Sequence, residues 1–441
     1  MLIAENLLWL LILIGVMILV HELGHFWAAR YFDVKVEVFS FGFGPRLFGF
    51  RRGETDYRFS AILFGGYVKM AGEQPGDEGL DDPRGFLAKP RWQRLIIAGA
   101  GPFMNIVLAV ALLTGLFMVK YQRVVEPSVR GLVGHVAANS PADRAGIREG
   151  DRIVRLAGKE NPSWEDIILT EVAGASVPLE VAIERDGRRI ETTVTPVLEE
   201  RSGVGSAGWA ERGEVQLGSL SANMPAEKSG LKPGDLVRRV NGQPIGSAIK
   251  FHELIRGSKG RAVEIEVERE GRRIDFTVQP VWAKLDGPER WMIGAIVAQK
   301  LKIETTRLPF FEAVEQSVEH NIRGATLIAQ FLKGIVERRM SAKSLEGPIG
   351  IARLSGDAAR EGAYEFFQLM SMVSLNLAIF NLLPIPILDG GVILMLLVEM
   401  VMRRDLSLRV KEAVFKVGFV FIMMIVAFVL YNDISKILPA G

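Results

Sequence analysis

The 441-residue sequence contains no cysteine. This absence excludes disulfide bonds, a thiol nucleophile and thiolate ligation of a metal. Histidine is scarce, with five residues in the whole chain, and the formal net charge is only +2. A charge so close to zero gives no sign of a basic surface for nucleic acid, so we expect no nucleic-acid partner.

Long apolar segments, by contrast, are plentiful. Hydrophobic residues make up 49% of the chain, and they are clustered in blocks. A helix needs about 20 apolar residues to cross a bilayer. Four segments meet this condition and are predicted as spans over residues 1–30, 95–119, 365–402 and 413–432. The first has no basic start and no small-residue cleavage site, so we interpret it as a span rather than a signal peptide.

Basic residues predict the orientation of these spans. Eleven lysines and arginines lie between the first and second apolar blocks, and four lie between the third and fourth. Short loops rich in positive charge stay on the cytoplasmic side of a membrane. We therefore expect residues 31–94 to form a cytoplasmic or membrane-reentrant β region, and the long middle segment to lie outside the cytoplasm.

This middle segment contains an internal repeat with a constant offset of 84 residues. SPADRAGIREGDRIVRLAGK at 140–159 corresponds to MPAEKSGLKPGDLVRRVNGQ at 224–243. Each copy predicts a short helix that ends at a glycine, a strand opened by Gly-Asp, and a terminal hairpin. The hairpins are expected to turn at Asp186-Gly187 and Glu270-Gly271.

The repeated pattern resembles PDZ domains, and the resemblance implies one domain over residues 124–200 and another over 210–283. PDZ domains bind extended peptides at a sheet edge. The resemblance places the groove entrances at 134–135 and 218–220. A rigid spacer or a steric filter is an equally compatible role. Residues 305–362 are expected to connect this pair to the third span, with an amphipathic helix over 309–338.

The candidate metal site begins with His21-Glu22-Leu23-Gly24-His25, inside the first span. Residues four apart share one face of a helix, so both imidazoles can reach one ion. Two histidines and a glutamate are costly in apolar surroundings unless they are paired or bound to metal. A structural polar cluster between helices is the alternative. We predict that His21 and His25 bind Zn²⁺ and that Glu22 is the general base.

A third protein ligand is needed, and Asp389 is the best candidate. It follows the segment NLLPIPIL at 381–388, in which two prolines prevent a regular helix. Unwound backbone at membrane depth is tolerated where it lines a polar site. The alternative is that Asp389 caps the helix expected over 390–402. Asn105, in the second span, is expected to pack between helices.

Together these features resemble the site-2 proteases, a family of intramembrane zinc metalloproteases. The matching motifs are HExxH in the first span, NxxPxPxLDGG at 381–391 and the repeat between them, with further matches at 41–45, 65–70, 101–105 and 347–350. The resemblance implies that His21, His25 and Asp389 bind zinc and that Glu22 is the catalytic base. It also implies that Asn381 lies beside the zinc and binds the substrate backbone.

The implied fold is an α-helical membrane protein with about four transmembrane helices, a membrane-associated β-hairpin and two inserted extracytoplasmic PDZ domains. We interpret residues 57–70 as the hairpin, dipping toward the active site. Within it, Gly65, Gly66, Tyr67 and Val68 are expected to pair with an unwound substrate. An ordinary cytoplasmic hairpin is the alternative.

The resemblance also implies the substrates and the location. The substrates would be single-span membrane proteins already trimmed on the outside, such as an RseA-like anti-sigma factor of the sigma-E envelope stress response, and remnant signal peptides. The protein would lie in the bacterial inner membrane, with its PDZ domains in the periplasm and its active site toward the cytoplasm. A non-catalytic scaffold and an ion transporter are the competing classes, and a transporter should show repeats among its spans.

Overall fold

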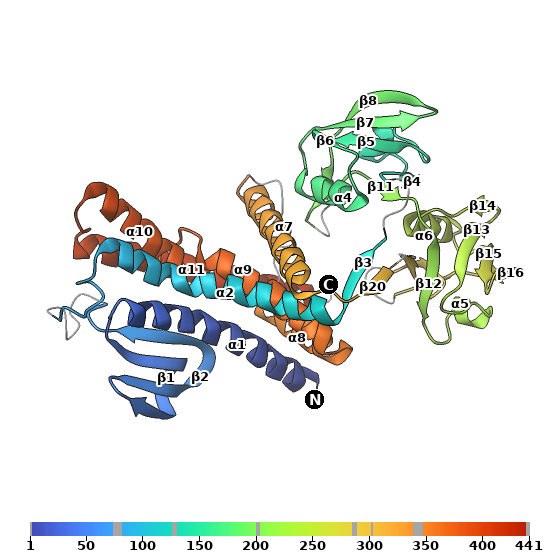
Figure 1. Cartoon of the computed structure of the whole chain (residues 1–441). Helices are drawn as coiled ribbons and strands as arrows, with labels where there is room; N and C mark the ends of the chain where they lie inside the picture. The colour runs from blue at the N-terminus through green and yellow to red at the C-terminus, as the bar shows by residue number, and fades with distance from the viewer. Residues whose placement is uncertain are drawn as a thin grey trace. The chain divides into compact units, whose positions relative to one another are not determined.

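The computed structural model describes residues 2–73, 82–125, 130–199, 203–284, 289–300, 303–337 and 347–437. The chain divides into two compact units. The first comprises residues 1–121, 306–329 and 345–441, and the second comprises residues 122–305 and 330–344. The first unit is mainly helical, whereas the second is rich in β-strands (Figure 1).

Long helices build the first unit. Their bounds are α1 Leu2–Tyr31, α2 Arg91–Val119, α7 Phe310–Val336 (within this unit as far as Ala329), α8 Pro348–Glu361, α9 Ala363–Asn381, α10 Asp389–Met402 and α11 Leu408–Ile437. Among the described residues, four stretches are long and apolar enough to cross a membrane, at 3–31, 91–119, 363–381 and 409–435. The prediction of four spans is thus confirmed. The predicted amphipathic helix is α7, and its last predicted residue, 338, lies outside the described residues.

The third predicted span is two helices. α9 ends at Asn381, and α10 begins at Asp389 after a short non-helical link. The two prolines in the link cannot donate the backbone hydrogen bonds that would continue α9. Residues 365–402 therefore contain one candidate span and one separate helix.

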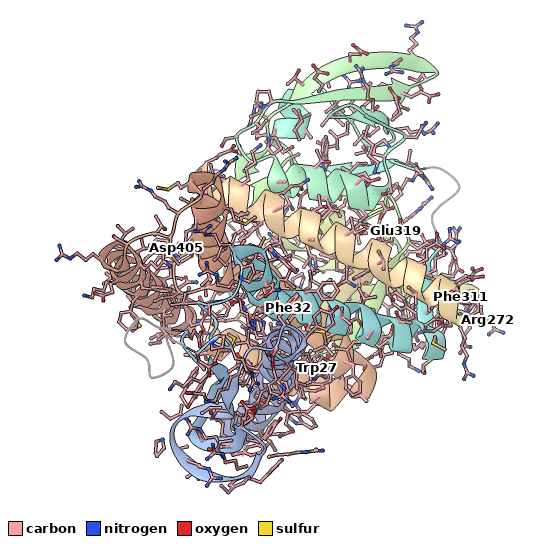
Figure 2. The ribbon with its side chains drawn as sticks, turned by 60° about the vertical axis from the view of Figure 1, so that its left-hand side comes forward. Trp27, Phe32, Arg272, Phe311, Glu319 and Asp405 are labelled. Atoms are coloured by element: carbon pink, nitrogen blue, oxygen red, sulfur yellow. The ribbon has the colours of Figure 1, made fainter. Side chains whose placement is uncertain are left out.

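The apolar surface of these helices is largely uncovered by protein. Trp27 of α1 is 54% exposed and Phe311 of α7 is 84% exposed (Figure 2). In α11, only 6% of the most apolar 18-residue stretch is buried within the protein. Exposed apolar surface on this scale indicates an interface with lipid or another apolar partner.

Close helix packing brings α1 against α2. A Cβ atom on Gly24 would lie 2.3 Å from the carbonyl oxygen of Ala100, so only glycine fits at this crossing. α2 also receives two hydroxyl hydrogen bonds from α9, because Ser371 donates to the Ala109 carbonyl and Ser374 to the Asn105 carbonyl. α1, α2 and α9 therefore form one packed group.

A long β-hairpin lies beside α1, formed by β1 Val36–Arg52 and β2 Thr55–Met70 (Figure 1). The chain turns at Gly53, where φ is +62°. The prediction that residues 57–70 alone form a hairpin is therefore wrong. β2 is one continuous strand, and Gly65 lies inside it with φ +143°. A Cβ there would collide with the Phe43 ring, so glycine accommodates a bulky neighbour instead of making a turn.

The second unit contains two β-rich modules. We call residues 130–211 module 1 and residues 212–300 module 2. Module 1 contains β4 Val133–Val136, α3 Pro141–Arg144, β5 Arg152–Leu156, β6 Lys159–Glu160, α4 Trp164–Ala173, β7 Leu179–Arg185, β8 Arg188–Val194, β9 Val197–Leu198, β10 Gly205–Ser206 and β11 Trp209–Glu211. Module 2 contains β12 Val215–Leu220, α5 Pro225–Lys228, β13 Leu236–Val240, β14 Gln243–Pro244, α6 Ala248–Gly257, β15 Val263–Arg269, β16 Arg272–Val278, β17 Val281–Ala283, β18 Arg290–Met292 and β19 Ala295–Gln299. The short strands β3 Tyr121–Val124 and β20 Ile303–Thr306 pair with each other.

The predicted hairpins occur in both modules. β7 and β8 turn at Asp186-Gly187, and β15 and β16 turn at Glu270-Gly271. All four turn residues have φ between +50° and +76°, as a two-residue type I′ turn requires.

The predicted groove entrances do not lie at open sheet edges. β19 folds back and pairs with β12 from Val215 to Leu220, and β11 pairs with β4 at residues 133–136. Segments that follow each repeat therefore cover the edges at 218–220 and 134–135. In module 2 the end strand of the sheet is β19, in the order β16-β15-β13-β12-β19.

Candidate metal centre

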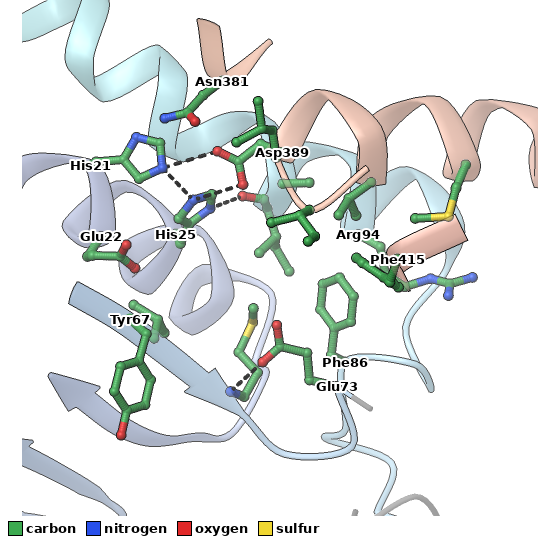
Figure 3. A pocket seen from close by; sticks show the side chains of 18 of the residues that line it. His21, Glu22, His25, Tyr67, Glu73, Phe86, Arg94, Asn381, Asp389 and Phe415 are labelled. Carbon is green, nitrogen blue, oxygen red and sulfur yellow. Dashed lines mark hydrogen bonds and ion pairs between the residues drawn. The ribbon is translucent and has the colours of Figure 1, made fainter. Parts of the chain in front are cut away.

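Three polar side chains from opposite ends of the chain meet in the first unit. His21 and His25 lie one turn apart on α1, and Asp389 opens α10 (Figure 3). The two Nε2 atoms are 3.2 Å apart. The carboxylate oxygens of Asp389 lie 3.1 Å from His21 Nε2 and 3.5 Å from His25 Nε2. The structure thus brings together the three residues predicted as ligands.

These three donors fit a zinc ion. Zinc binds histidine nitrogen and carboxylate oxygen at about 2.0–2.1 Å in tetrahedral sites, which places neighbouring ligand atoms about 3.3 Å apart. The distances of 3.1, 3.2 and 3.5 Å are close to this spacing. Gly101 of α2 leaves the necessary room, because a Cβ there would lie 2.3 Å from His25 Nε2 and 2.7 Å from His21 Nε2.

Helix α2 orients both histidine rings. His25 Nδ1 donates to the Ile97 carbonyl at 2.8 Å, and His21 Nδ1 lies 3.1 Å from the amide of Asn105. Asn105 is fully buried, and its Oδ1 has no partner when Nδ2 faces the ring. Rotating the amide by a half-turn lets Oδ1 accept the His21 Nδ1–H. Both rings then present Nε2 toward Asp389.

The contact between Asn105 and His21 was missed by the sequence reasoning, which assigned Asn105 to helix packing alone. The available signal was a single asparagine in an otherwise apolar span. A polar side chain at that depth needs a partner, but the sequence does not show which helix supplies it.

The backbone before α10 explains how Asp389 reaches the histidines. Leu388 occupies the N-cap position and makes no side-chain cap, so Asp389 lies inside the first turn. Cβ atoms on Gly390 and Gly391 would lie 2.2 and 2.4 Å from the carbonyl oxygens of Leu383 and Ile385. The two glycines therefore let the proline-containing link fold tightly over the start of α10, while the Asp389 side chain points to the imidazoles.

A cavity of about 910 Å³ opens beside this cluster. Its lining includes all the residues predicted for the site, namely His21, Glu22, His25, Gly65, Gly66, Tyr67, Val68, Asn381 and Asp389. A Cβ on Gly66 would lie 3.2 Å from Glu22 Cγ, and the Val68 backbone hydrogen-bonds to the Glu22 carboxylate. β2 therefore passes directly over the glutamate. Asn381 lies near His21 and Asp389 (Figure 3).

A second charged group lines the same cavity and was also missed by the sequence reasoning. Glu399 of α10 is fully buried, and its carboxylate lies 2.7 Å from Lys411 Nζ and 3.7 Å from Arg94 Nη2. It also accepts the backbone N–H of Leu406. The signal in the sequence was a single glutamate in an apolar helix. Its cationic partners lie on two other helices, α2 and α11, which the sequence does not show.

Comparison with known proteins identifies the family of this chain. Residues 9–425 match the model of peptidase family M50. The chain is 30% identical to the regulator of sigma-E protease RseP of Salmonella typhimurium, covering 98% of this chain and 99% of the relative. It is 30% identical to RseP of Escherichia coli, covering 97% and 98%. It is 31% identical to a protein of Treponema pallidum named as a candidate zinc metalloprotease, covering 96% and 97%.

The chain therefore belongs to peptidase family M50, and it is a zinc metalloprotease. The family assignment agrees with the absence of cysteine, because two imidazoles and a carboxylate complete a catalytic zinc site without thiolates.

Proposed function

We propose that this protein is an intramembrane protease that cleaves single-span membrane proteins at the site formed by His21, His25 and Asp389, with Glu22 as general base. The main support for this proposal is the triangle formed by the donor atoms of His21, His25 and Asp389. It lies beside Glu22, and the helix that carries Glu22 is apolar and long enough to cross a bilayer. Zinc held there supplies a Lewis acid that polarises a peptide carbonyl and lowers the pKa of water.

The chain's own groups carry the proton and hold the substrate. The Glu22 carboxylate accepts a proton from the attacking water and returns it to the nitrogen of the leaving amine. Asn381, at the end of α9, donates its side-chain amide to the substrate carbonyl, where negative charge develops. Its place in the cavity wall near Asp389 supports this role.

A substrate helix must unwind before it can be cut, because its peptide groups are hydrogen-bonded to one another. Lipid cannot pair with the freed groups, so the enzyme must. Residues Gly65 to Val68 of β2 line the cavity, and among the described residues β2 pairs with β1 alone. We propose that the unwound segment adds to this edge of β2 as a further strand.

The two modules, which extend past the predicted bounds 124–200 and 210–283 to include β11 and β19, would act as PDZ domains. They would stand outside the membrane and turn away substrates with bulky outer domains. The inner membrane is the proposed location, with the catalytic site toward the cytoplasm. The relatives named regulator of sigma-E protease RseP support an RseA-like anti-sigma factor as the substrate. Remnant signal peptides are the second proposed substrate class.

The test is a cleavage assay on a purified single-span substrate, with bound zinc measured in the same samples. Glu22→Gln should retain zinc and reduce cleavage by about 10²–10⁴-fold, the usual contribution of a general base. Glu37 is half-buried on the hairpin and forms an ion pair with Lys69, and Glu37→Gln is the matched control that should cleave normally. Cleavage by zinc-loaded Glu22→Gln at the normal rate would refute the assignment.

A further inference from the structure

A cluster of buried charges lines the cavity away from the metal centre. We call Arg94 of α2, Glu399 of α10 and Lys411 of α11 the charged cluster. Glu399 is fully buried and Arg94 is 4% exposed. The proposed reaction gives neither group a task. A buried ion pair is also weak evidence for stability, because apolar side chains of similar volume often stabilise a protein equally well. The charged cluster therefore needs another explanation.

One face of α10 connects the charged cluster with the metal centre. Asp389, Val392, Met395, Leu396 and Glu399 all line the cavity, at the spacing of neighbouring turns of a helix. A helix rises about 1.5 Å per residue, so Asp389 and Glu399 lie about 15 Å apart along α10. The helix thus carries a proposed zinc ligand at its first residue and a buried ion-pair partner near its last turn.

One face of α2 makes the corresponding connection. Arg94, Ile97 and Ala98 line the same cavity, and Gly101 lies against both imidazoles one turn further on. The Ile97 carbonyl accepts the hydrogen bond of His25. α2 also packs against α10, and Arg94 lies in the cavity wall (Figure 3). The helix that orients the histidines is therefore also the helix that contacts Glu399.

Apolar packing leaves the position of α10 loosely defined. Among the residues of α10, all of which the structure describes, those that are buried besides two glycines are Leu396 and Glu399. Other apolar side chains, such as Leu397 and Val401, are exposed. Lipid is as apolar as these side chains, so their contacts favour no particular rotation or axial position of the helix. A buried ion pair does, because its partner has a fixed place.

The contacts of Glu399 fix it from several sides. Its Oε1 accepts from Lys411 Nζ at 2.7 Å and from the Leu406 backbone N–H at 3.0 Å. Its Oε2 lies 3.7 Å from Arg94 Nη2 and has no hydrogen-bond partner within the described part of the chain. Arg94 Nη2 also donates to Asp405, in the link between α10 and α11. The last turn of α10 is thus held to α2 by charge.

We propose that Glu399 is a positioning residue for Asp389, because its ion pair with Arg94 fixes α10 against α2 and so holds the Asp389 carboxylate at the two imidazoles. The proposal rests on the proposed ligand set. The three donor atoms are 3.1–3.5 Å apart, and a metal site tolerates displacements of only about 0.5 Å. A small shift of α10 along α2 would therefore remove Asp389 from the metal without unfolding the protein.

The first test measures zinc affinity of the full-length protein in detergent, by competition with a chelator. Glu399→Gln keeps the volume and can still accept the Leu406 N–H, but it removes the charge. We expect zinc binding about tenfold weaker, at the lower end of the range for supporting groups. Glu412→Gln is the matched control, because Glu412 is exposed on α11 in the wall of the same cavity, and it should bind zinc normally. Normal zinc affinity in Glu399→Gln overturns the proposal.

A double-mutant cycle distinguishes positioning of Asp389 from a general effect on the fold. In the Asp389→Ala protein, the further change Glu399→Gln should alter zinc affinity by less than about twofold, because the ligand that it positions is gone. Loss of the full effect size again in that background overturns the proposal, since Glu399 would then act on the histidines or on the whole unit. Normal zinc affinity in Asp389→Ala would refute the proposed ligand set instead, so the two failures are distinguishable.

Two variants of Arg94 test the other half of the ion pair. Arg94→Lys keeps a positive charge opposite Glu399 and should bind zinc nearly as well as the unaltered protein. Arg94→Met should weaken zinc binding as Glu399→Gln does, although its apolar side chain should leave the unfolding temperature of the metal-free protein largely unchanged. Equal zinc affinities in the two Arg94 variants overturn the proposal. If Glu399→Gln does not fold, this comparison decides the question.

Discussion

The helical unit and the repeated β unit satisfy their buried polar groups in different ways. In the helical unit, His21 depends on Asn105 and Asp389, which lie far away in the sequence. In the β unit, Asp151 binds Arg185 and Asp235 binds Arg269, each pair 34 residues apart within its own module. A change in the helical unit should therefore disturb several helices, whereas a change in a module should remain local.

The largest expected effect is loss of the residue that joins the two ends of the chain. Asp389→Ala removes one of three zinc donors, so we expect bound zinc to fall far below one equivalent and cleavage to be abolished. Metal analysis of the purified protein measures the bound zinc, and an assay on a single-span substrate measures cleavage. Asp357→Ala, at an exposed acid on α8, is the control and should keep its zinc. Full zinc stoichiometry in Asp389→Ala would show that another residue is the third ligand.

The next effect tests whether a module responds locally. Asp151 is buried, and both of its oxygens accept from the Arg185 guanidinium at 2.6 Å. Asp151→Ala should destabilise module 1 by about 2 kcal/mol, because Arg185 loses its partner. The effect is not larger because water still reaches the partly exposed Arg185. Limited proteolysis of module 1 measures this, with zinc content as the internal control. Loss of zinc in this variant would contradict the locality of the module.

A smaller effect is expected from the group that orients His21. Asn105→Leu keeps the branched outline of the side chain but removes the hydrogen bond to His21 Nδ1. Loss of such a supporting contact typically weakens metal binding by about tenfold or more. Competition with a chelator measures the affinity, and Asn105→Asp, which can still accept the ring N–H, is the comparison. Equal zinc affinity in Asn105→Leu would mean that the Ile97 and Asp389 contacts alone hold the two rings.

The smallest effect distinguishes the two modules by pH. Burial raises the pKa of Glu171, although hydrogen bonds from Ala207, Trp209 and Gly208 oppose the increase. The folded module then binds a proton more readily than the unfolded chain, so this contribution to stability is lost as pH rises from about 4.5 through the folded pKa. Urea unfolding of module 1 at several pH values measures the slope, and Glu171→Gln should flatten it.

Module 2 should respond with the opposite sign. Burial lowers the pKa of His252, and the neighbouring charges of Arg256 and Arg290 lower it further. The folded module binds a proton less readily than the unfolded chain, so stability is full above about 6.5 and falls as the pH drops below it. His252→Gln should remove this slope in module 2 and leave that of module 1 unchanged. Parallel profiles in both modules would contradict the assignment.

Much of the fold could be predicted, because its signals are local. The four spans were visible as apolar length, and the hairpin turns at Asp186-Gly187 and Glu270-Gly271 as turn residues between alternating strands. The hairpin beside α1 was misplaced because Gly65-Gly66 has the composition of a turn. Only the packing of Phe43 shows that the glycine there makes room for a ring.

The sequence by itself predicted the residues that the structure brings together at the candidate metal centre, because HExxH on a helix aligns two imidazoles and a chain without cysteine must add histidine or carboxylate. It also determined the repeat, because both modules arise from short-range patterns. Only the tertiary structure decided that Asn105 and Ile97 orient the rings, that Glu399 is paired by Arg94 and Lys411, and that Glu171 accepts hydrogen bonds from Ala207 and Trp209. Those contacts join elements that are distant in the chain, and no spacing within one element encodes which distant partner a buried polar group will meet.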